Sequence, residues 1–575
     1  MMSRPVPRHT DSGHLNNRVP AYCPVWSEEC HQRGFWGDRL LFDEVVAQAD
    51  QRPSKIAVSD ESGVYRYDQL VLETMSLMVG LQELGVQRGD VVLVAMPPMR
   101  EFVPTILAVE RLGAIVANVL PTLGKRELEH IFKLATPRVV FAVAKYRGYW
   151  PAKTLHGVMI TSKQISSLVI AGEGLFGSDL PSKDGIRVTA YADLVDRNRS
   201  RKGILVRRKL PDPPSPDEIA NLTFTTGSTN EPKGVLHTHN TSLLAVRSTA
   251  ARQELGEDDV FHAVLPVGHT FGYFYGIRLG LAVGGQVVMQ RTWDSAEMFE
   301  LTEKWRITHS AGTPTHLADI LGSNRSLGRS LASLRVFTCA GAALESRVAE
   351  DAINRLPGRL SIAYGMSEAG HVASTGPGAG DDKVVSSCGR PHPETTLWVD
   401  MTVSEDGGKS GEVVIRGPSV FAGYLEYPDP AVRERQRDGV YRTGDFGYLD
   451  PDGYLVLTGR RAELIIRGGE KIPVGSLERI LCGFPGVSDV VVTGVPDPRL
   501  GERCVAVIEA RRPSDIQLEG VLDFLKNQGV TRAFWPEAVV VVPRLPRNEV
   551  GKWVRSSVRQ IACERLGINS DRMPG

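Results

Sequence analysis

The chain has 575 residues, of which 42% are hydrophobic and 23% charged, a composition typical of a globular protein with about three or four compact units. Equal numbers of basic and acidic residues, 67 of each, give a net charge of zero, which argues against a dominant role in binding nucleic acid or an anionic membrane. The seven cysteines lack paired CxxC spacing, so the sequence indicates no zinc site and favours a reducing cytoplasm.

The first part of the chain combines an arm with helices and a hairpin. Residues 1–35 are rich in histidine, proline and arginine, and we expect an irregular arm, with a short packed extension as the alternative. Its start is polar, and no apolar run in the chain reaches 18 residues, so we expect neither a secretory signal nor a membrane-spanning helix. Spacing then predicts a helix over 41–49, a strand pair over 56–58 and 64–67, and a helix from Tyr67 to about Leu84 with Asp68 as N-cap.

From Gly89 the pattern becomes that of an α/β fold. Continuous apolar runs are typical of strands buried on both faces, and helical spacing between them predicts crossover connections in a parallel sheet. We expect strands at 91–94, 114–117 and 139–142, helices at 101–112 and 125–134, and a further strand at 158–160. Residues 172–218 carry little regular signal, and their basic stretch 197–209 is interpreted as an exposed connection.

A loop of small, hydroxylated residues follows the apolar stretch 219–224. It reads Thr225-Thr226-Gly227-Ser228-Thr229-Asn230-Glu231-Pro232-Lys233-Gly234, and an apolar run leads away from it, so we expect strand, loop and strand. Successive small residues expose backbone N–H groups and hydroxyls at one point, which suits a polyphosphate, and Lys233 adds positive charge. The loop is no Walker A motif, because a proline precedes the lysine and no helix follows.

The next segment places a histidine and several aromatic residues after a buried strand. We expect a helix over 243–252, a strand over 261–266, a helix to Ala282 and a strand over 286–289. The residues between the first strand and the second helix are Gly268, His269, Thr270, Phe271 and Gly272. A lone histidine in such a place is often an ordinary core or surface residue, which stays the alternative to a binding role.

Two further strands, expected at 334–338 and 360–363, each end in small or polar residues. The first runs into Gly341, Ala342 and Ala343, whose small side chains let a flat ring approach the backbone. The second runs into Tyr364-Gly365-Met366-Ser367-Glu368, whose Ser–Glu pair would otherwise suit a helix cap.

The last part of the chain is predicted to form a small β-barrel-like subdomain and then a compact α+β unit. Glycine-flanked strands at 411–417 and 423–424 begin the subdomain, and Tyr441-Arg442-Thr443-Gly444-Asp445 and Gly459-Arg460 end it. The α+β unit is expected to have helices at 475–481 and 518–527 and strands at 487–492, 504–508 and 538–542, and it ends in Pro546-Arg547-Asn548-Glu549-Val550-Gly551-Lys552.

These motifs together resemble the acyl-adenylate-forming, or AMP-binding, superfamily of acyl-CoA synthetases, aryl acid ligases and luciferases. The loop Thr-Thr-Gly-Ser-Thr-x-x-Pro-Lys-Gly, the Tyr-Gly-Met-Ser-Glu stretch, Asp445 and the Gly-Lys near the C-terminus stand in the family's order over most of the chain. The resemblance is nearest to ligases of alicyclic and aryl acids. It implies an α/β fold with a large multi-subdomain N-terminal domain, 36–460, of parallel sheets with flanking helices plus a small β-barrel, and a small mobile α+β domain, 461–575.

The resemblance also assigns roles to residues. Ser367, Glu368 and Lys552 would be catalytic, with Glu368 holding Mg²⁺, and His269, Thr270, Phe271, Gly341 and Gly365 would line the acyl pocket. Nucleotide or CoA would be bound by Thr225, Thr226, Gly227, Ser228, Thr229, Lys233, Gly341, Ala342, Ala343, Tyr364, Gly365, Met366, Asp445, Arg460, Gly468, Gly469 and Lys471. Asp445 would accept hydrogen bonds from the ribose hydroxyls, and Arg460 would contact ribose or phosphate.

The activity implied is a two-step ligase reaction with ATP, Mg²⁺ and CoA. A carboxylate attacks the α-phosphate of ATP to give acyl-AMP and pyrophosphate, and a thiol, that of CoA, then displaces AMP. Because the catalytic lysine and the CoA-tunnel glycines lie on the small domain, that domain is expected to rotate between the steps. The wall around His269 has aromatic residues and no obvious cation for a second carboxylate, which favours an apolar, cyclic acid.

Three positions depart from the family pattern. Asn230 stands in the phosphate loop where the family has glycine, Ala462 stands at the hinge in place of Asp or Lys, and Asn548 replaces threonine. They keep open a ligase that has lost adenylation and makes thioesters only from supplied acyl-AMP. A non-catalytic nucleotide- or acyl-binding protein is the alternative from another class, and the sequence leaves a homodimer open.

Overall fold

The computed structural model describes two units of this protein. The first spans Met1–Asp294, Met366–Gly370 and Pro418–Gly439, and the second spans Ser295–Gly365, His371–Gly417 and Val440–Gly575. Within them the described residues are 24–162, 167–172, 180, 185–199, 211–226, 232–323, 331–404, 410–425, 438–460, 465–467, 470–472, 474–497, 501–510, 516–528, 530, 532–548, 551 and 553–568.

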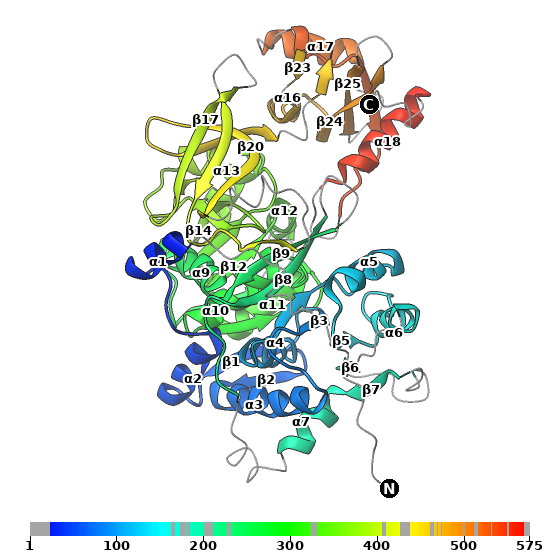
Figure 1. Ribbon diagram of the computed structural model, residues 1–575. Helices are drawn as coiled ribbons and strands as arrows, with labels where there is room; N and C mark the ends of the chain where they lie inside the picture. The colour runs from blue at the N-terminus through cyan, green and yellow to red at the C-terminus, as the bar shows by residue number, and fades with distance from the viewer. Residues whose placement is uncertain are drawn as a thin grey trace. The chain divides into compact units, whose positions relative to one another are not determined.

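The first unit is built on an eight-stranded sheet in the order β19-β9-β8-β4-β3-β5-β6-β7 (Figure 1). Its apolar strands from β8 to β7 pair in parallel, as the crossover pattern predicted, while β9 and β19 add an antiparallel edge. The strands are β3 (Val91–Ala95), β4 (Ile115–Asn118), β5 (Val139–Val143), β6 (Ser167–Ala171), β7 (Arg187–Ala190), β8 (Ile219–Thr226), β9 (Pro232–Thr238) and β19 (Gly423–Leu425).

Helices cover this sheet and connect its strands. They are α4 (Phe102–Arg111), α5 (Lys125–Ala135), α6 (Pro151–Ser162) and α7 (Tyr191–Arg199), and α5 packs beside α6 (Figure 1). The core between them is apolar: Leu93, Ile115 and Val140 of the strands and Phe132 of α5 are fully buried. This continuous burial explains why the strands read as unbroken apolar runs in the sequence.

A second group of strands in the first unit follows the order β10-β11-β1-β2. They are β10 (Val260–Ala263), β11 (Gln286–Met289), β1 (Ile56–Asp60) and β2 (Gly63–Arg66), with an antiparallel hairpin between β1 and β2 as predicted. The accompanying helices are α2 (Leu41–Gln51), α3 (Tyr67–Glu83), α9 (His239–Gln253), the π-helix η2 (Gly272–Arg278) and α10 (Leu279–Ala282). The helix predicted up to Ala282 is therefore present, but most of it is wound as a π-helix.

Several predictions for the first unit are wrong. Residues 24–32 of the expected irregular arm instead form helix α1 (Pro24–Gln32), which fits the alternative of a short packed extension, because Trp26 and Cys30 are buried with Trp36. The N-cap of α3 is Arg66 rather than Asp68, and the expected strand 158–160 belongs to α6. Residues 172–218, whose sequence shows little signal for regular structure, contain β7 and α7. A short apolar run fits a helix as well as a strand, and in α6 Val158 and Met159 are buried while Ile160 is 39% exposed.

The second unit contains a parallel three-strand segment and an antiparallel sheet. Strands β12 (His309–Gly312), β13 (Val336–Cys339) and β14 (Arg359–Met366) pair in parallel, and β15 (Gly370–Ser374) pairs with β16 (Arg390–Pro391). Their helices are α11 (Ser295–Trp305), α12 (Pro314–Ser323), α13 (Ser346–Arg355) and α14 (Asp381–Ser386).

The segment expected to be a small barrel is a four-stranded antiparallel sheet, β17-β18-β20-β21. Its strands are β17 (Thr396–Ser404), β18 (Gly411–Arg416), β20 (Val440–Leu449) and β21 (Leu455–Arg460), and the pairings of the described residues do not close them into a barrel. The predicted strand 423–424 exists as β19 but pairs with β9 of the first unit's sheet instead.

The C-terminal α+β unit forms as predicted. Its sheet runs β23-β22-β25-β24, with β26 pairing in parallel with β25, and apolar cores lie on both faces. The elements are β22 (Ile465–Arg467), β23 (Glu470–Ile472), α16 (Val474–Leu481), β24 (Val487–Asp497), β25 (Gly501–Ala510), α17 (Leu518–Asn527), η5 (Arg532–Phe534), β26 (Ala538–Val542) and α18 (Arg555–Leu566).

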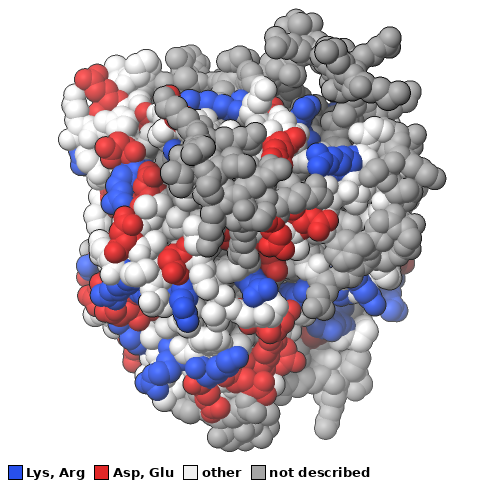
Figure 2. Space-filling model, turned by 90° about the horizontal axis from the view of Figure 1, so that it is seen from below, with Lys and Arg blue, Asp and Glu red and all other residues white. Residues whose placement is uncertain are grey.

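The surface charges and the lengths of the helices are consistent with the sequence. On the face seen in Figure 2, basic and acidic side chains are interspersed rather than gathered by sign. Within the described ranges, no helix has the length and apolar character needed to cross a bilayer.

Candidate active site

The strand pair β8–β9 carries the predicted phosphate loop. The two strands are antiparallel, with Thr225 opposite Lys233 and Thr226 opposite Pro232, so the loop closes a hairpin, as predicted. A Cβ at Gly234 would lie 2.7 Å from Leu222 Cδ1 and 3.1 Å from Leu425 Cβ, so a larger residue here would have to displace these side chains. The loop residues Gly227, Ser228, Thr229 and Asn230 lie outside the described part of the chain.

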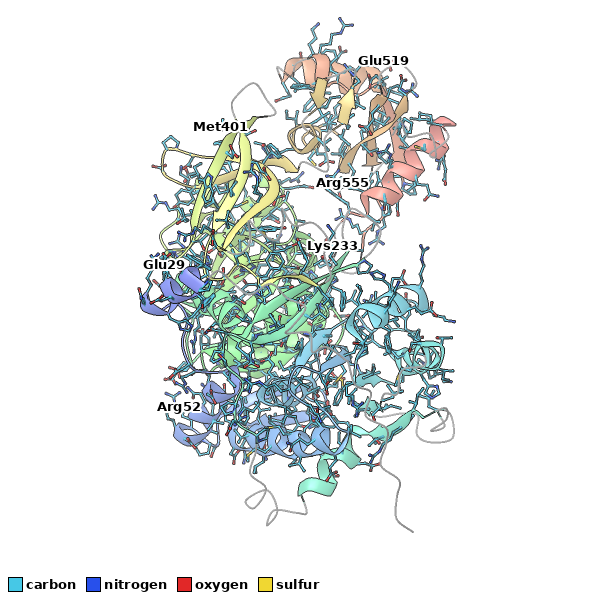
Figure 3. All side chains as sticks on the ribbon, viewed as in Figure 1. Glu29, Arg52, Lys233, Met401, Glu519 and Arg555 are labelled. Carbon is cyan, nitrogen blue, oxygen red and sulfur yellow. The ribbon has the colours of Figure 1, made fainter. Side chains whose placement is uncertain are left out.

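Lys233 and Glu368, two predicted site residues, are brought together by a tyrosine. Lys233 (labelled in Figure 3) lies half-buried on β9 with its Nζ 5.7 Å from the centroid of the Tyr424 ring. The Tyr424 hydroxyl donates a 2.6 Å hydrogen bond to Glu368 Oε1. The residues that flank the phosphate loop and the predicted metal ligand therefore belong to one cluster of the first unit.

The backbone of Ser367 and Glu368 is held from two sides. Phe421 N donates to the Glu368 carbonyl at 2.8 Å, and His237 Nε2 lies 2.7 Å from the Ser367 carbonyl. Because a carbonyl only accepts, the imidazole must carry its proton on Nε2. Burial lowers the pKa of His237 to about 4, although the bond to Ser367 opposes this shift, so the ring is neutral at pH 7.

The predicted acyl wall lies in the same unit. Gly268 packs so closely that a Cβ would lie 2.6 Å from the backbone of Val119 and Leu120. His269 and Phe271 are half-buried, while Thr270 is 4% exposed. The Phe271 ring lies 6.0 Å from that of Tyr275 in an edge-on arrangement.

Tyr275 connects this wall to the Ser367–Glu368 stretch. A Cβ at Gly370, two residues after Glu368, would lie 2.6 Å from the Tyr275 hydroxyl, and Gly370 itself has a φ of +66°. Tyr275 therefore lies close to the backbone that follows Ser367 and Glu368.

A buried ionic network, which was not predicted from the sequence, holds the π-helix that follows the predicted acyl wall. Arg278 ends the π-helix with a side chain that is 0% exposed, and it pairs with Glu110 of α4, 3% exposed, at 2.5 Å. The Tyr273 hydroxyl donates to the same Glu110 oxygen at 2.8 Å, and Arg278 also donates to Ser242 at 3.0 Å. An arginine set between Ile277 and Leu279 in an apolar helix was the available signal, because a buried guanidinium requires an acidic partner.

In the second unit, the predicted base and ribose residues meet. The Tyr364 hydroxyl donates a 2.6 Å hydrogen bond to Asp445 Oδ2, and both residues are buried. Asp445 is further fixed because its backbone N–H donates to Thr443 Oγ1 at 3.0 Å. Asp445 stands opposite Arg460 in the register of β20 and β21.

The small residues proposed to face the adenine follow the neighbouring strand. β13 and β14 pair in parallel with Cys339 opposite Ile362, so Gly341–Ala343 and Tyr364–Gly365 leave the same edge of the sheet. Gly341 has a φ of 89°, a conformation that favours glycine, and Ala342 and Ala343 are exposed. Met366 is half-buried at the end of β14.

The remaining predicted residues are only partly described. Lys471 pairs with Ile466 in the β22–β23 hairpin, and the Asn548 carbonyl accepts a 2.9 Å bond from Gly551 N. Gly468, Gly469, Lys552 and Ala462 lie outside the described residues, as do the side chains of Thr226 and Arg460.

The donor set around Glu368 suits a hard divalent cation. The carboxylate is half-buried, with Oε1 held by Tyr424, which leaves Oε2 as the oxygen to offer to a metal. A single protein carboxylate combined with substrate phosphate oxygens is a common set of ligands for Mg²⁺. The residues present therefore fit the cation that the sequence predicted.

Comparisons with known proteins identify the family of this chain. Residues 45–425 match the family described as AMP-binding enzyme, and residues 476–552 match the AMP-binding enzyme C-terminal domain. The chain is 29% identical over 543 residues to the medium-chain fatty-acid–CoA ligase of Escherichia coli K12, which covers 93% of this chain and 92% of that protein. It is 31% identical over 547 residues to a salicylyl-CoA synthase/salicylate adenylyltransferase of a Streptomyces species, with coverage of 93% and 97%.

Among solved structures, the anthranilate CoA ligase AuaEII in complex with anthranoyl-AMP has a TM-score of 0.78 at 20% identity, over 92% of this chain and 98% of that one. At this identity the likeness shows a shared fold, a large domain of parallel sheets and helices followed by a small C-terminal domain. Because the family match spans residues 45–425 and continues into the C-terminal domain, the chain belongs to the AMP-binding enzymes, as its motifs predicted.

Proposed function

We propose that this protein is an AMP-forming acyl-CoA ligase that activates a hydrophobic, cyclic carboxylic acid. The coarse class, an acid–thiol ligase, is that of the CoA ligases to which the chain is similar over more than nine-tenths of its length. At the site, the proposal is supported by the cluster of Lys233, Tyr424 and Glu368. In it, a cation and a carboxylate that would bind a metal lie on either side of one tyrosine, as a reaction between two anions would require.

In the first step, an oxygen of the acid carboxylate attacks the α-phosphorus of ATP, and the bond to pyrophosphate breaks. Lys233 and the N–H groups of the loop it follows would bind the β- and γ-phosphates, and Ser367 would donate to the α-phosphate. Glu368 would hold Mg²⁺, which when bound supplies positive charge to the phosphate oxygens. Lys552 would add charge from the small domain.

In the second step, the CoA sulfur attacks the acyl carbonyl carbon, AMP leaves and the thiol proton passes to solvent. Gly468 and Gly469 would border the pantetheine path, and the small domain, 461–575, would rotate between the two steps. The domain limits 36–460 and 461–575, the cytoplasmic location and a homodimer stay predictions.

The choice of a cyclic acid rests on the wall and on one class of relatives. Phe271 offers a half-buried aromatic ring that packs against the buried Tyr275, and the segment 268–275 contains no lysine or arginine. The salicylyl-CoA synthase among the relatives acts on an aryl acid by its name, whereas the Escherichia coli relative is named for medium-chain fatty acids. An apolar body with a single carboxylate is common to both.

The test separates the two half-reactions. The purified protein receives ATP, Mg²⁺, CoA and a panel of cyclic and linear acids, and in parallel synthetic acyl-AMP with CoA. We expect acid-dependent pyrophosphate release in the first assay and thioester in both. Thioester only from supplied acyl-AMP would instead support the ligase without adenylation that Asn230 and Ala462 suggest, and Asn230→Gly would then be expected to raise adenylation.

A second test addresses the non-catalytic alternative. The substitution Lys552→Ala is expected to reduce adenylate formation by a factor of about 100 or more, because it removes a charge that acts on the transition state. Nucleotide affinity is expected to stay near that of the wild type. A wild-type protein that binds ATP but forms neither adenylate nor thioester would support a binding protein.

A further inference from the structure

Tyr424 lies between the two charged residues that the proposed reaction uses. Its ring faces Lys233 Nζ, and its hydroxyl holds Glu368 Oε1 at 2.6 Å. A charge-assisted O–H···O⁻ bond at this distance is short and directional. The tyrosine is 9% exposed, so solvent competes little for the bond.

The backbone explains why Tyr424 stands in this place. β19 pairs with β9 in antiparallel register, so Tyr424 lies opposite Val235 and Leu425 opposite Gly234. Lys233 is the next residue along β9, and the preceding residues of the β19 segment contact Glu368 as well, through Phe421 N. The Tyr424 and Phe421 rings pack edge-on at 4.8 Å, which limits rotation of the tyrosine.

Glu368 needs a hydrogen-bonding partner to hold its side chain in one orientation. A glutamate side chain has freely rotating bonds, and fixing it for a ligand costs conformational entropy at the moment of binding. A hydrogen bond to one carboxylate oxygen fixes the plane of the group and directs the second oxygen, as partners of metal ligands generally do. The tyrosine supplies this bond from a strand that also fixes the lysine.

We propose that Tyr424 is a positioning residue that aligns the Glu368 carboxylate for the divalent cation and keeps Lys233 beside it, so that both charges meet one polyphosphate. The proposal deepens the function proposed above and rests on it for the role of Glu368. The Tyr424 hydroxyl acts on the cation site through Glu368, and the ring acts on Lys233. Substitutions that remove only the hydroxyl or the whole ring can therefore separate the two effects.

The test measures cation binding directly. Mn²⁺ is titrated into the full-length protein saturated with a non-hydrolysable ATP analogue, and free Mn²⁺ is followed by electron paramagnetic resonance. Tyr424→Phe keeps the ring and removes the bond to Glu368, and we expect Mn²⁺ affinity to fall about tenfold, as loss of a hydrogen bond to a charged group implies. Tyr424→Leu is expected to weaken binding of the analogue as well.

A matched control comes from the four-stranded sheet. Tyr448→Phe removes a hydroxyl from a residue of β20 that is 41% exposed, and we expect wild-type Mn²⁺ affinity. Thioester formation from synthetic acyl-AMP needs no polyphosphate, so Tyr424→Phe is expected to reduce its rate much less than it reduces Mn²⁺ affinity.

Two outcomes would overturn the proposal. One is an unchanged Mn²⁺ affinity in Tyr424→Phe, and the other is an equal loss of metal binding and of the thioester step, which would indicate general damage to the fold. If the wild type releases no pyrophosphate, the proposed first half-reaction fails, but the Mn²⁺ titration still decides on Tyr424. The two failures are therefore distinguishable.

Discussion

Among the described residues of the first unit, a closed and an open group of acid, tyrosine and base differ in exposure. In the group of Glu110, Tyr273 and Arg278, the arginine and the glutamate are 0% and 3% exposed, and the tyrosine bonds to the same carboxylate oxygen as the arginine. In the group of Glu368, Tyr424 and Lys233, both charged residues are half-buried, and the tyrosine stands between them.

The difference in exposure distinguishes a structural role from a role in binding. The closed group makes its hydrogen bonds within the protein, so it can hold the π-helix in place but offers little to a ligand. The open group places a carboxylate and an ammonium at half-buried positions, which a ligand can reach. Charged clusters with similar composition can therefore serve a structural role or a binding role, and burial decides which.

The largest expected effect comes from breaking the closed group. Arg278→Met leaves the Glu110 carboxylate buried without its partner, and we expect the free energy of unfolding to fall by about 3–5 kcal/mol. Urea unfolding of the full chain measures this loss. Adding Glu110→Gln should recover part of it, because the uncompensated charge is gone.

Arg247→Met is a matched control for that variant. Arg247 pairs with Glu44 at 2.5 Å but is 43% exposed, so its removal is expected to change stability by about 1 kcal/mol or less. A similar loss in both arginine variants would contradict the distinction between the two groups.

The next effect comes from breaking the open group. Glu368→Gln is expected to reduce adenylate formation by a factor of about 100 to 1,000, since it removes a charge that acts on the reacting phosphates. Its unfolding free energy should stay within about 0.5 kcal/mol of the wild type. Pyrophosphate release and urea unfolding are measured on the same preparation, and a large loss of stability at unchanged activity would reverse our assignment.

We expect acid to lower the free energy of unfolding through two buried histidines near Arg278. Burial, together with the nearby Arg278 charge, lowers the pKa of His237 to about 4 and that of His239 to about 3. Because both values lie below the ordinary 6.5, the unfolded chain takes up protons first, so these residues contribute full stability above about pH 6.5 and lose it as pH falls toward 4. Each would add a slope of up to about 1.4 kcal/mol per pH unit.

Unfolding free energies at pH 7, 6 and 5 test this dependence. The variant His239→Gln cannot take up the proton, so its stability is expected to fall less steeply with acid than that of the wild type. Equal slopes for the two proteins would mean that His239 plays no part in the acid sensitivity.

The smallest expected effect concerns the wall. Phe271→Ala removes half-buried aromatic surface, and we expect kcat/KM for cyclic acids to fall about tenfold, the value of roughly 1.4 kcal/mol of apolar contact. Linear acids should lose less, because they touch less of the ring. Competition between a cyclic and a linear acid measures the preference, and an equal loss for both would remove Phe271 from the specificity of the site.

The sequence predicted the motif residues of this site and most of its strands, because these depend on local patterns. Lys233 beside a hydroxyl-rich hairpin and Glu368 after a buried strand could be read from neighbouring residues alone. Apolar runs such as Val91-Val92-Leu93-Val94 likewise determine a strand without distant information.

The contacts of the site that could not be predicted join segments that are distant in the sequence. Tyr424 and Glu368 are 56 residues apart, and Glu110 and Arg278 are 168 apart, so no local pattern joins them. Gly423-Tyr424 looks like any short strand with a glycine, and only the register with β9 makes it part of the site. The helix at Pro24–Gln32 was missed for a similar reason, since its apolar residues are few and gain their burial from Trp36.

The central claim is that Lys233 and Glu368 act together on one nucleotide to make an acyl-adenylate. The most direct measurement is the product balance of the wild-type protein with ATP, a cyclic acid and CoA. Our account predicts one AMP and one pyrophosphate for each acyl-CoA formed, with none of them made without the acid. Formation of ADP and phosphate, or of acyl-CoA without AMP, would contradict it.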